Sequence, residues 1–155
     1  MHAVARNITA VFTSKVPTEF GESFTFSKIY YSNLDDQNVT VEEFVPGTFQ
    51  KYVNNDGKSV VPTESDNEVI YEKAQCLCHF SYVYTDKKLM LLDLQGAKYH
   101  LYDSEIATAS LCGISDEPTE IYFCVGNITF QGIEEFLIDH ICNRFSKFMN
   151  LPSNP

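Results

Sequence analysis

The sequence has few basic residues and no long hydrophobic run. Lysine and arginine number 11 against 21 acidic residues, which gives a formal net charge of −10. This balance argues against binding to nucleic acid or to an anionic membrane surface, because both need a surplus of basic side chains. No stretch approaches the roughly 18 consecutive apolar residues of a membrane span, and the N-terminus lacks the apolar core of a secretory signal. We therefore expect no nucleic-acid partner and no membrane segment.

Cysteine is too sparse and too unevenly spaced for a disulfide framework. The chain has an odd number of cysteines, at positions 76, 78, 112, 124 and 142. Free thiols in a reducing compartment fit this set better than paired ones. We therefore expect a cytoplasmic protein.

Several common catalytic motifs are also missing. Neither phosphate-binding loop, G-x-x-x-x-G-K-[ST] or G-x-G-x-x-G, occurs in the sequence. No serine or cysteine stands in a nucleophile elbow of the form G-x-S-x-G. A phosphate site made from backbone amides and a metal ion stays open, since it needs no net basic charge.

The segments that are present predict one α+β domain over residues 1–155. With 44% hydrophobic and 14% aromatic residues, the composition is that of a globular chain with a real core. Apolar spacing and turn residues predict the secondary structure. The expected elements are a helix over 1–13, a hairpin of 24–32 and 38–45, a helix from a capping box at 65–68 to about residue 79, and a helix over 133–151.

The most informative stretch is Leu-Met-Leu-Leu-Asp-Leu-Gln-Gly at 89–96. Its apolar run predicts a buried strand. Side chains alternate along a strand, so Asp93 and Gln95 are expected on one face, about 7 Å apart. A carboxylate and an amide oxygen at this position suit a hard cation bound together with a phosphate. An ordinary core strand, in which Asp93 caps the next turn, explains the pattern equally well.

Three soft metal ligands are His79, beside this predicted strand, and His140 and Cys142, in the predicted last helix. Structural zinc normally takes four ligands, often in closely spaced pairs. From spacing alone, side chains that pair with one another in the core are the commoner explanation.

Taken in order along the chain, the sequence resembles the alpha-type (atypical) protein kinases. The pattern is most similar to the channel-kinase and elongation factor 2 kinase group, and its most specific parts are Asp-Leu-Gln-Gly with Asp103 ten residues after Asp93, and His-x-Cys-Asn. The matching segments are VEE at 41–43, GTFQKYVNNDG at 47–57, VPT at 61–63, HFSY at 79–82, LLDLQG at 91–96 and HICNR at 140–144.

This resemblance implies an alpha-kinase fold, mainly its C-terminal lobe with part of the N-terminal lobe. The implied activity is transfer of the γ-phosphate of ATP, with Mg²⁺, to serine or threonine hydroxyls of a protein substrate. Asp93, Gln95 and Asp103 would be the catalytic residues, with Asp93 and Gln95 also holding the magnesium ion. Phosphoryl transfer fits such a set, because it depends on positioning and charge neutralisation.

The resemblance also implies a nucleotide site and a zinc site. The hinge that receives adenine would comprise Glu42, Glu43 and Val45, and the nucleotide-binding residues would include Asn54 and Asn55. The implied zinc ligands are His79, His140 and Cys142.

The sequence departs from the family pattern in three places. Ser146 replaces the cysteine that would be the fourth zinc ligand, which predicts substoichiometric zinc. The loop at 124–129 lacks two glycines of the family's substrate loop. No counterpart of the family's ATP-anchoring lysine precedes the matched segments, so we expect these 155 residues alone to have little or no kinase activity. The alternative function is therefore a pseudokinase-like module that acts through protein contacts.

Overall fold

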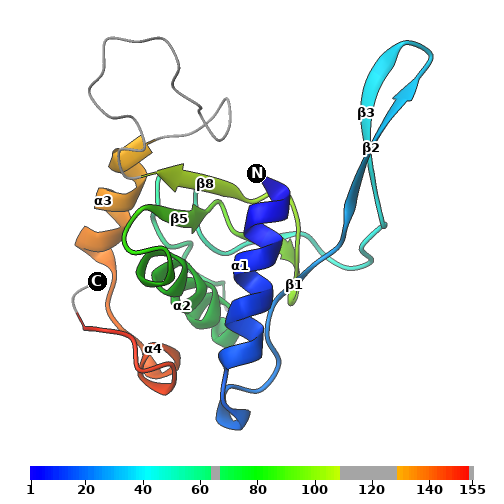
Figure 1. Cartoon of the computed structure of the whole chain (residues 1–155). Coiled ribbons are helices and arrows are strands. Elements are labelled where there is room, and N and C mark those ends of the chain that lie inside the picture. Colours follow the sequence, from blue (N-terminus) through cyan, green and yellow to red (C-terminus); the bar gives the residue numbers. More distant parts are fainter. Residues whose placement is uncertain (64–66, 109–128, 154–155) are drawn as a thin grey trace, which may run out of the picture.

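Helix α2 (Glu68–Tyr84) is the central element of the computed structural model, which describes residues 1–63, 67–108 and 129–153 (Figure 1). Helices α1 (His2–Lys15) and α4 (Arg144–Phe148) and strand β5 (Leu89–Leu92) all pack against it. Its side chains are buried on several faces, as expected for a helix that lies inside a core rather than on a surface.

Helix α2 begins and ends later than its sequence predicts. Its N-cap is Asn67, whose side chain accepts a hydrogen bond from the Val69 N–H (3.2 Å); the predicted capping box falls partly on residues 64–66, outside the described residues. The helix continues past His79 because no glycine or proline interrupts it before Thr85. There the Thr85 hydroxyl donates to the Ser81 carbonyl (2.8 Å). The expected end near residue 79 is therefore wrong, and His79 lies within α2, the helix that packs against β5.

Helix α1 (His2–Lys15) confirms the helix predicted at the start of the chain. Its buried residues, Ala5, Ile8, Thr9 and Phe12, follow the 3–4 residue spacing of one helical face. This face packs on α2, where the Phe12 and Phe80 rings lie 5.1 Å apart between centroids. A short 3-10 turn, η1 (Thr18–Phe20), follows.

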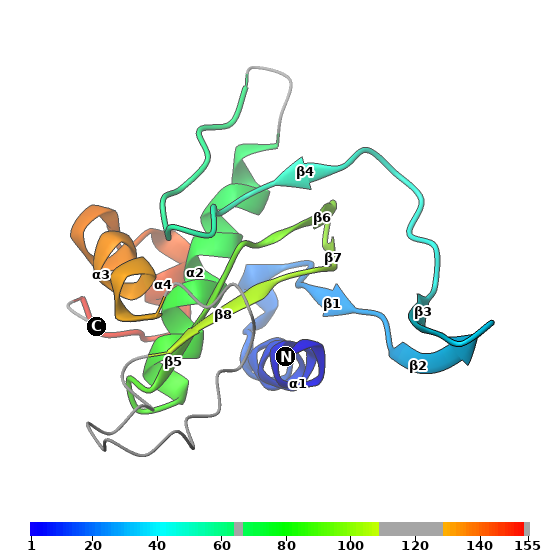
Figure 2. The same cartoon turned by 90° about the horizontal axis from the view of Figure 1, so that it is seen from above.

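A β-hairpin of β2 (Ile29–Leu34) and β3 (Gln37–Glu42) projects from the rest of the structure (Figures 1 and 2). The predicted hairpin is confirmed, with a tighter turn than expected. Asp35 and Asp36 form a two-residue turn with φ of 49° and 61°, the positive values that the common hairpin turns require.

The other described strands form two further sheets, one of four strands in the order β1-β7-β6-β4 and one that pairs β5 with β8. Strand β1 runs parallel to β7, and the remaining pairs are antiparallel. The strands are β1 (Thr25–Phe26), β4 (Gln50–Lys51), β5 (Leu89–Leu92), β6 (Gln95–Ala97), β7 (His100–Leu101) and β8 (Glu105–Thr108).

The buried run at 89–96 is interrupted at Asp93, so the prediction of one continuous strand is wrong. Asp93 has a φ of 52°, which ends β5 and starts a new direction before β6. All four side chains of β5 are buried, as predicted. Strict alternation of side chains does not hold across a residue in the left-handed region, so the expected shared face of Asp93 and Gln95 has no basis in this backbone.

The helix predicted over 133–151 is two helices, α3 (Thr129–Asp139) and α4 (Arg144–Phe148). Asn143 caps α4, since its Oδ1 accepts from the N–H groups of Phe145 (2.9 Å) and Ser146 (3.2 Å). Its Nδ2 donates to the Glu72 carbonyl of α2 (2.7 Å). Phe136 of α3 and Phe145 of α4 are buried, but Ile141 between the helices is 82% exposed, so the predicted apolar stripe is interrupted at the break. His140 and Cys142 lie in the break rather than within a helix.

Among the described residues, no helix combines the length and the apolarity that crossing a membrane requires. The predicted loop at 124–129 lies outside the described residues, apart from Thr129, which begins α3.

Candidate active site

Asp93 is held at the break between β5 and β6 by contacts with the segment around β4. Its side chain is 12% exposed, and its Oδ1 lies 2.6 Å from Nζ of Lys51. Its N–H donates to the Asn54 carbonyl (3.3 Å). An ion pair this short, with one partner largely buried, fixes the orientation of the carboxylate and offsets part of its charge. Lys51 had no assigned role in the sequence analysis, although it stands in the matched Lys-Tyr-x-Asn-Asn segment.

Gln95 and Asp103 are joined by a hydrogen bond from side chain to backbone. Gln95 Nε2 donates to the Asp103 carbonyl (2.9 Å), which places the amide oxygen on the opposite side of the side chain. Lys51 is the strand partner of Gln95 between β4 and β6, so Gln95 lies close to the Lys51–Asp93 pair. Asp103 is exposed, with a φ of 52°. The structure thus brings all three predicted catalytic residues into one region.

Glu105 joins this region and was missed by the sequence analysis. It is the strand partner of Leu92, the residue before Asp93. Burial raises the pKa of the Glu105 carboxyl, Asp93 and Asp103 raise it further, and Lys51 lowers it. The two aspartates therefore act on it electrostatically, and one lysine and three carboxyl groups share the site. In the sequence, only its position two residues after Asp103 indicated that Glu105 could belong to the site.

The predicted hinge residues line a cavity of about 340 Å³. Glu42 and Glu43 are exposed and Val45 is half-buried, and Phe44 and Tyr102 complete the lining. The Tyr102 N–H donates to the Gln95 carbonyl (3.2 Å), which connects this cavity to the carboxylate site. Aromatic walls with nearby polar groups form a suitable site for a planar base.

Asn54 and Asn55 lie in a turn that packs against α3. The Asn54 carbonyl accepts from both Asp93 and Gly57 N–H groups (3.3 and 3.1 Å). Gly57 has a φ of +84°, and a Cβ there would overlap with the carbonyl of Gly132 in α3 and lie 2.9 Å from the Phe136 nitrogen. The turn thus supports Asp93 through its backbone, a contribution that residue types alone do not reveal.

The three predicted zinc ligands form a compact group, which we call the zinc tripod: His79 of α2, and His140 and Cys142 of the break. His79 Nδ1 lies 3.1 Å from His140 Nε2 and 3.6 Å from Cys142 Sγ, and the latter two atoms are 3.7 Å apart. Around tetrahedral zinc, donor atoms are separated by about 3.3 Å for two nitrogens and about 3.6 Å for nitrogen and sulfur. The tripod therefore fits zinc.

The environment of the two tripod histidines favours their neutral form. Burial, together with a smaller effect of His140, lowers the pKa of His79 to about 4, and burial also lowers the pKa of His140. Their outer nitrogens, His79 Nε2 and His140 Nδ1, are buried and make no hydrogen bond with any described residue. Neutral imidazole is the form that binds a metal.

These shifts predict that the metal-free protein loses stability as the pH falls. Between about pH 6.5 and pH 4 the unfolded chain binds a proton at His79 that the folded chain does not, so the free energy of unfolding should fall by about 3 kcal/mol. Urea unfolding with a chelator present measures this. The variant His79→Asn should flatten the profile, and a wild-type profile that is flat over this range would contradict the prediction.

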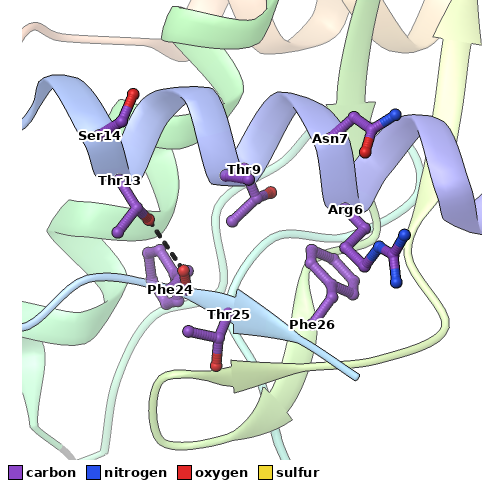
Figure 3. Close-up of a pocket in the computed structure, with 9 residues that line it drawn as sticks. Arg6, Asn7, Thr9, Thr13, Ser14, Phe24, Thr25 and Phe26 are labelled. Carbon is purple, nitrogen blue, oxygen red and sulfur yellow. Dashed lines mark hydrogen bonds between the residues drawn. The ribbon is translucent and has the colours of Figure 1, made fainter. Parts of the chain in front are cut away.

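A separate cavity of about 570 Å³ lies between α1 and β1 (Figure 3). Thr13 Oγ1 donates to the Phe24 carbonyl across it (2.9 Å). The Thr9 hydroxyl is buried and makes no hydrogen bond with a described residue. None of the predicted site residues lines this cavity, so we assign it no catalytic role.

Comparison with known proteins agrees with the expected family. The profile of the alpha-kinase family matches residues 1–146. Transient receptor potential cation channel subfamily M member 7 of Homo sapiens is 29% identical over 150 residues, 96% of this chain. Myosin heavy chain kinase B of Dictyostelium discoideum is 33% identical over 115 residues, 74% of this chain. The chain spans 8% and 14% of the lengths of these two relatives.

Solved structures extend the likeness to the whole chain. The alpha-kinase domain of myosin heavy chain kinase A in complex with ADP matches with a TM-score of 0.79 at 23% identity, over 100% of this chain and 57% of that one. The C-terminally truncated alpha-kinase domain of a myosin heavy chain kinase gives the same TM-score at 22% identity. At this identity the likeness shows the fold, and the expected partial alpha-kinase fold is confirmed. With the family profile matched over residues 1–146, the chain belongs to the alpha-kinase family.

Proposed function

We propose that these residues form the carboxylate half of the active site of an ATP-dependent serine/threonine protein kinase. The observation that carries this proposal is Asp93, held by Lys51 at 2.6 Å on an interrupted strand, with Gln95 beside it. The relatives and the ADP complex named above support a kinase nucleotide site. Phosphoryl transfer requires little covalent chemistry from a protein, so such a preorganised charged group is the feature it most needs.

In this mechanism Asp93 receives the proton of the substrate hydroxyl or binds the metal ion. Lys51 keeps the carboxylate in place, so no reorganisation is needed when the substrate arrives. Asp103, which is exposed, contacts the substrate side of the site and orients Gln95 through its carbonyl.

The donor set of the site also fits magnesium. Asp93 and Gln95 offer a carboxylate and an amide oxygen, the ligand types that Mg²⁺ prefers, and Glu105 adds a further carboxyl group nearby. When bound, the ion would neutralise charge on the phosphates of ATP. The Glu42–Val45 cavity would take the adenine, and Asn54 and Asn55 would lie on the nucleotide side of Asp93.

We also propose a structural zinc ion in the zinc tripod. It would tie α2 to the break between α3 and α4, where Asn143 already joins these elements. This role is separate from catalysis. The Cys142 thiol must stay reduced to bind zinc, which the cytosol permits.

The kinase proposal is tested by two readouts on the same protein. A fluorescent ATP analogue, titrated with and without Mg²⁺, should bind more tightly with the ion. Transfer of labelled γ-phosphate to a serine- or threonine-containing peptide then tests the chemistry. Little or no transfer is expected from these 155 residues alone, so Mg²⁺-dependent binding without transfer is compatible with both the proposal and the pseudokinase-like alternative. Transfer that Asp93→Ala abolishes would exclude the alternative. Absence of both binding and transfer would overturn the nucleotide site.

A further inference from the structure

The zinc tripod lacks one ligand, since zinc in a structural site normally takes four. Ser146, in the first turn of α4, is fully buried, and its hydroxyl makes no hydrogen bond of ordinary geometry with a described residue. A serine hydroxyl is a poor zinc ligand. His79 is buried and His140 and Cys142 are half-buried, and with Cys142 as the single thiolate and two neutral imidazoles the site would also keep a net charge of +1. Burying an uncompensated charge is costly.

Two other described thiols, Cys76 and Cys78, lie on α2 close to His79 in sequence, and both are fully buried. At 3.6 residues per turn, residues three apart share a helix face, whereas adjacent residues point about 100° apart. Cys76 is three residues before His79 and therefore lies on its face. Cys78 is adjacent to His79 and points elsewhere.

The surroundings of the two thiols distinguish them further. The Cys76 thiol is near enough to Ser146 and Cys142 for both to act on its pKa, which burial raises to about 12. Ser146 lowers this pKa by hydrogen bonding and Cys142 raises it. Burial also raises the pKa of Cys78, but the side chain that acts on it is Cys76. Cys76 therefore lies between α2 and α4, on the side of the zinc tripod.

The Cys76 side chain must change its conformation to reach a metal ion held by the tripod. Its sulfur lies outside the group of three donors that are within 4.8 Å of one another. A change of χ1 rotamer moves a cysteine sulfur by about 3 Å, enough to bring it toward the tripod. Helical ligand pairs with the same three-residue spacing, Glu-x-x-His, bind the metals of di-iron helix bundles.

We propose that Cys76 is the fourth zinc ligand in this chain, completing a Cys₂His₂ site with His79, His140 and Cys142. As Zn²⁺ binds, both thiols lose a proton to solvent, and two thiolates with two neutral imidazoles leave the site with no net charge. Ser146 serves as a hydrogen-bond donor to the Cys76 thiolate instead of as a ligand. The inference rests on the proposed zinc site and is independent of kinase activity.

The wild-type protein tests the ligand set without any substitution. With Cys76 as the fourth ligand, metal analysis should give one zinc per chain rather than the substoichiometric zinc expected from Ser146 alone. Zinc X-ray absorption should show two sulfur ligands at about 2.3 Å. Zinc binding in weakly buffered solution should release two protons from thiols. One sulfur per zinc would overturn the assignment of Cys76 while leaving the three-ligand site intact. No bound zinc would overturn the site itself.

Matched cysteine variants then identify which thiol binds. In the cobalt-loaded protein, Cys76→Ala should lose about half of the sulfur-to-cobalt charge-transfer absorption, and its zinc affinity should fall by about 100-fold. Cys78→Ala, on the same helix, should keep both. If Cys78→Ala loses the absorption and Cys76→Ala does not, the ligand is Cys78 and the proposal is wrong.

A rescue experiment guards against a simple packing effect. The double variant Cys76→Ala, Ser146→Cys moves the thiol from α2 to α4 and should recover both the absorption and the affinity. Circular dichroism of each variant with bound metal reports whether it is folded. A single variant Cys76→Ala that is folded and keeps full absorption would contradict the proposal, whatever the double variant does.

Discussion

Replacing Asp93 by asparagine is expected to weaken Mg²⁺-dependent ATP binding by about 100-fold or more. Loss of an outer partner of a metal site typically costs 10- to 100-fold, and Asp93 is proposed to be a direct ligand. The fold should survive, because asparagine has the same shape and tolerates the positive φ of 52° at this position. The measurement is a titration of a fluorescent ATP analogue over a range of Mg²⁺ concentrations.

Without Mg²⁺, the substitution Asp93→Asn should not weaken ATP binding. A buried carboxylate repels the phosphates of ATP, so its removal should leave metal-free binding unchanged or slightly tighter. It also frees Lys51, 2.6 Å from Asp93 Oδ1, to interact with phosphate. Asp86→Asn, at an exposed turn, is the matched control and should change neither titration. Equal weakening with and without Mg²⁺ in Asp93→Asn would show that Asp93 is not a metal ligand.

Replacing Gly57 by alanine is expected to lower the free energy of unfolding by about 3 kcal/mol, the upper part of the range for overpacking of a core. The new Cβ would overlap with the Gly132 carbonyl and crowd Phe136 of α3, at a φ of +84°. Both neighbours are backbone or first side-chain atoms, which cannot move away cheaply. For a domain of this size, the melting temperature should fall by about 10 °C.

A control in the same turn separates the steric clash from a general effect of mutation. Asn55 is exposed, and Asn55→Ala should change the free energy of unfolding by no more than about 0.5 kcal/mol. Because Asn54 accepts a hydrogen bond from the Asp93 N–H, Gly57→Ala should also weaken Mg²⁺-dependent ATP binding. Equal stability of the two variants would rule out the close approach of this turn to α3.

The helices and the hairpin could be predicted because their signals are local. The spacing of Ile8 and Phe12, for example, defines the buried face of α1 within four residues. Two of the wrong predictions concern continuity. The apolar run continues across the break at Asp93, and buried residues, Phe136 and Phe145, likewise lie on the two sides of the break before α4. Hydrophobic periodicity reports which residues are buried and does not report where the backbone changes direction.

Some residues of the candidate site could be predicted from the sequence, and others could be found only from the tertiary structure. The sequence alone supplied Asp93, Gln95 and Asp103, because they stand in a matched order of motifs. It did not supply Lys51 or Glu105, which reach Asp93 through strand pairing with residues more than ten positions away. Such contacts depend on register between strands, a property that the residue types within one strand do not specify.

The zinc tripod shows most clearly which properties the sequence determined and which the tertiary structure determined. The sequence by itself determined the family, the mixed α+β content and the identity of the donors His79, His140 and Cys142. Only the tertiary structure decided that the donor atoms lie within 3.1–3.7 Å of one another, and that Cys76 shares the face of His79 next to Ser146. Donor chemistry belongs to single residues, whereas a metal site requires α2 to pack against the break between α3 and α4. That packing is set by core burial over the whole chain.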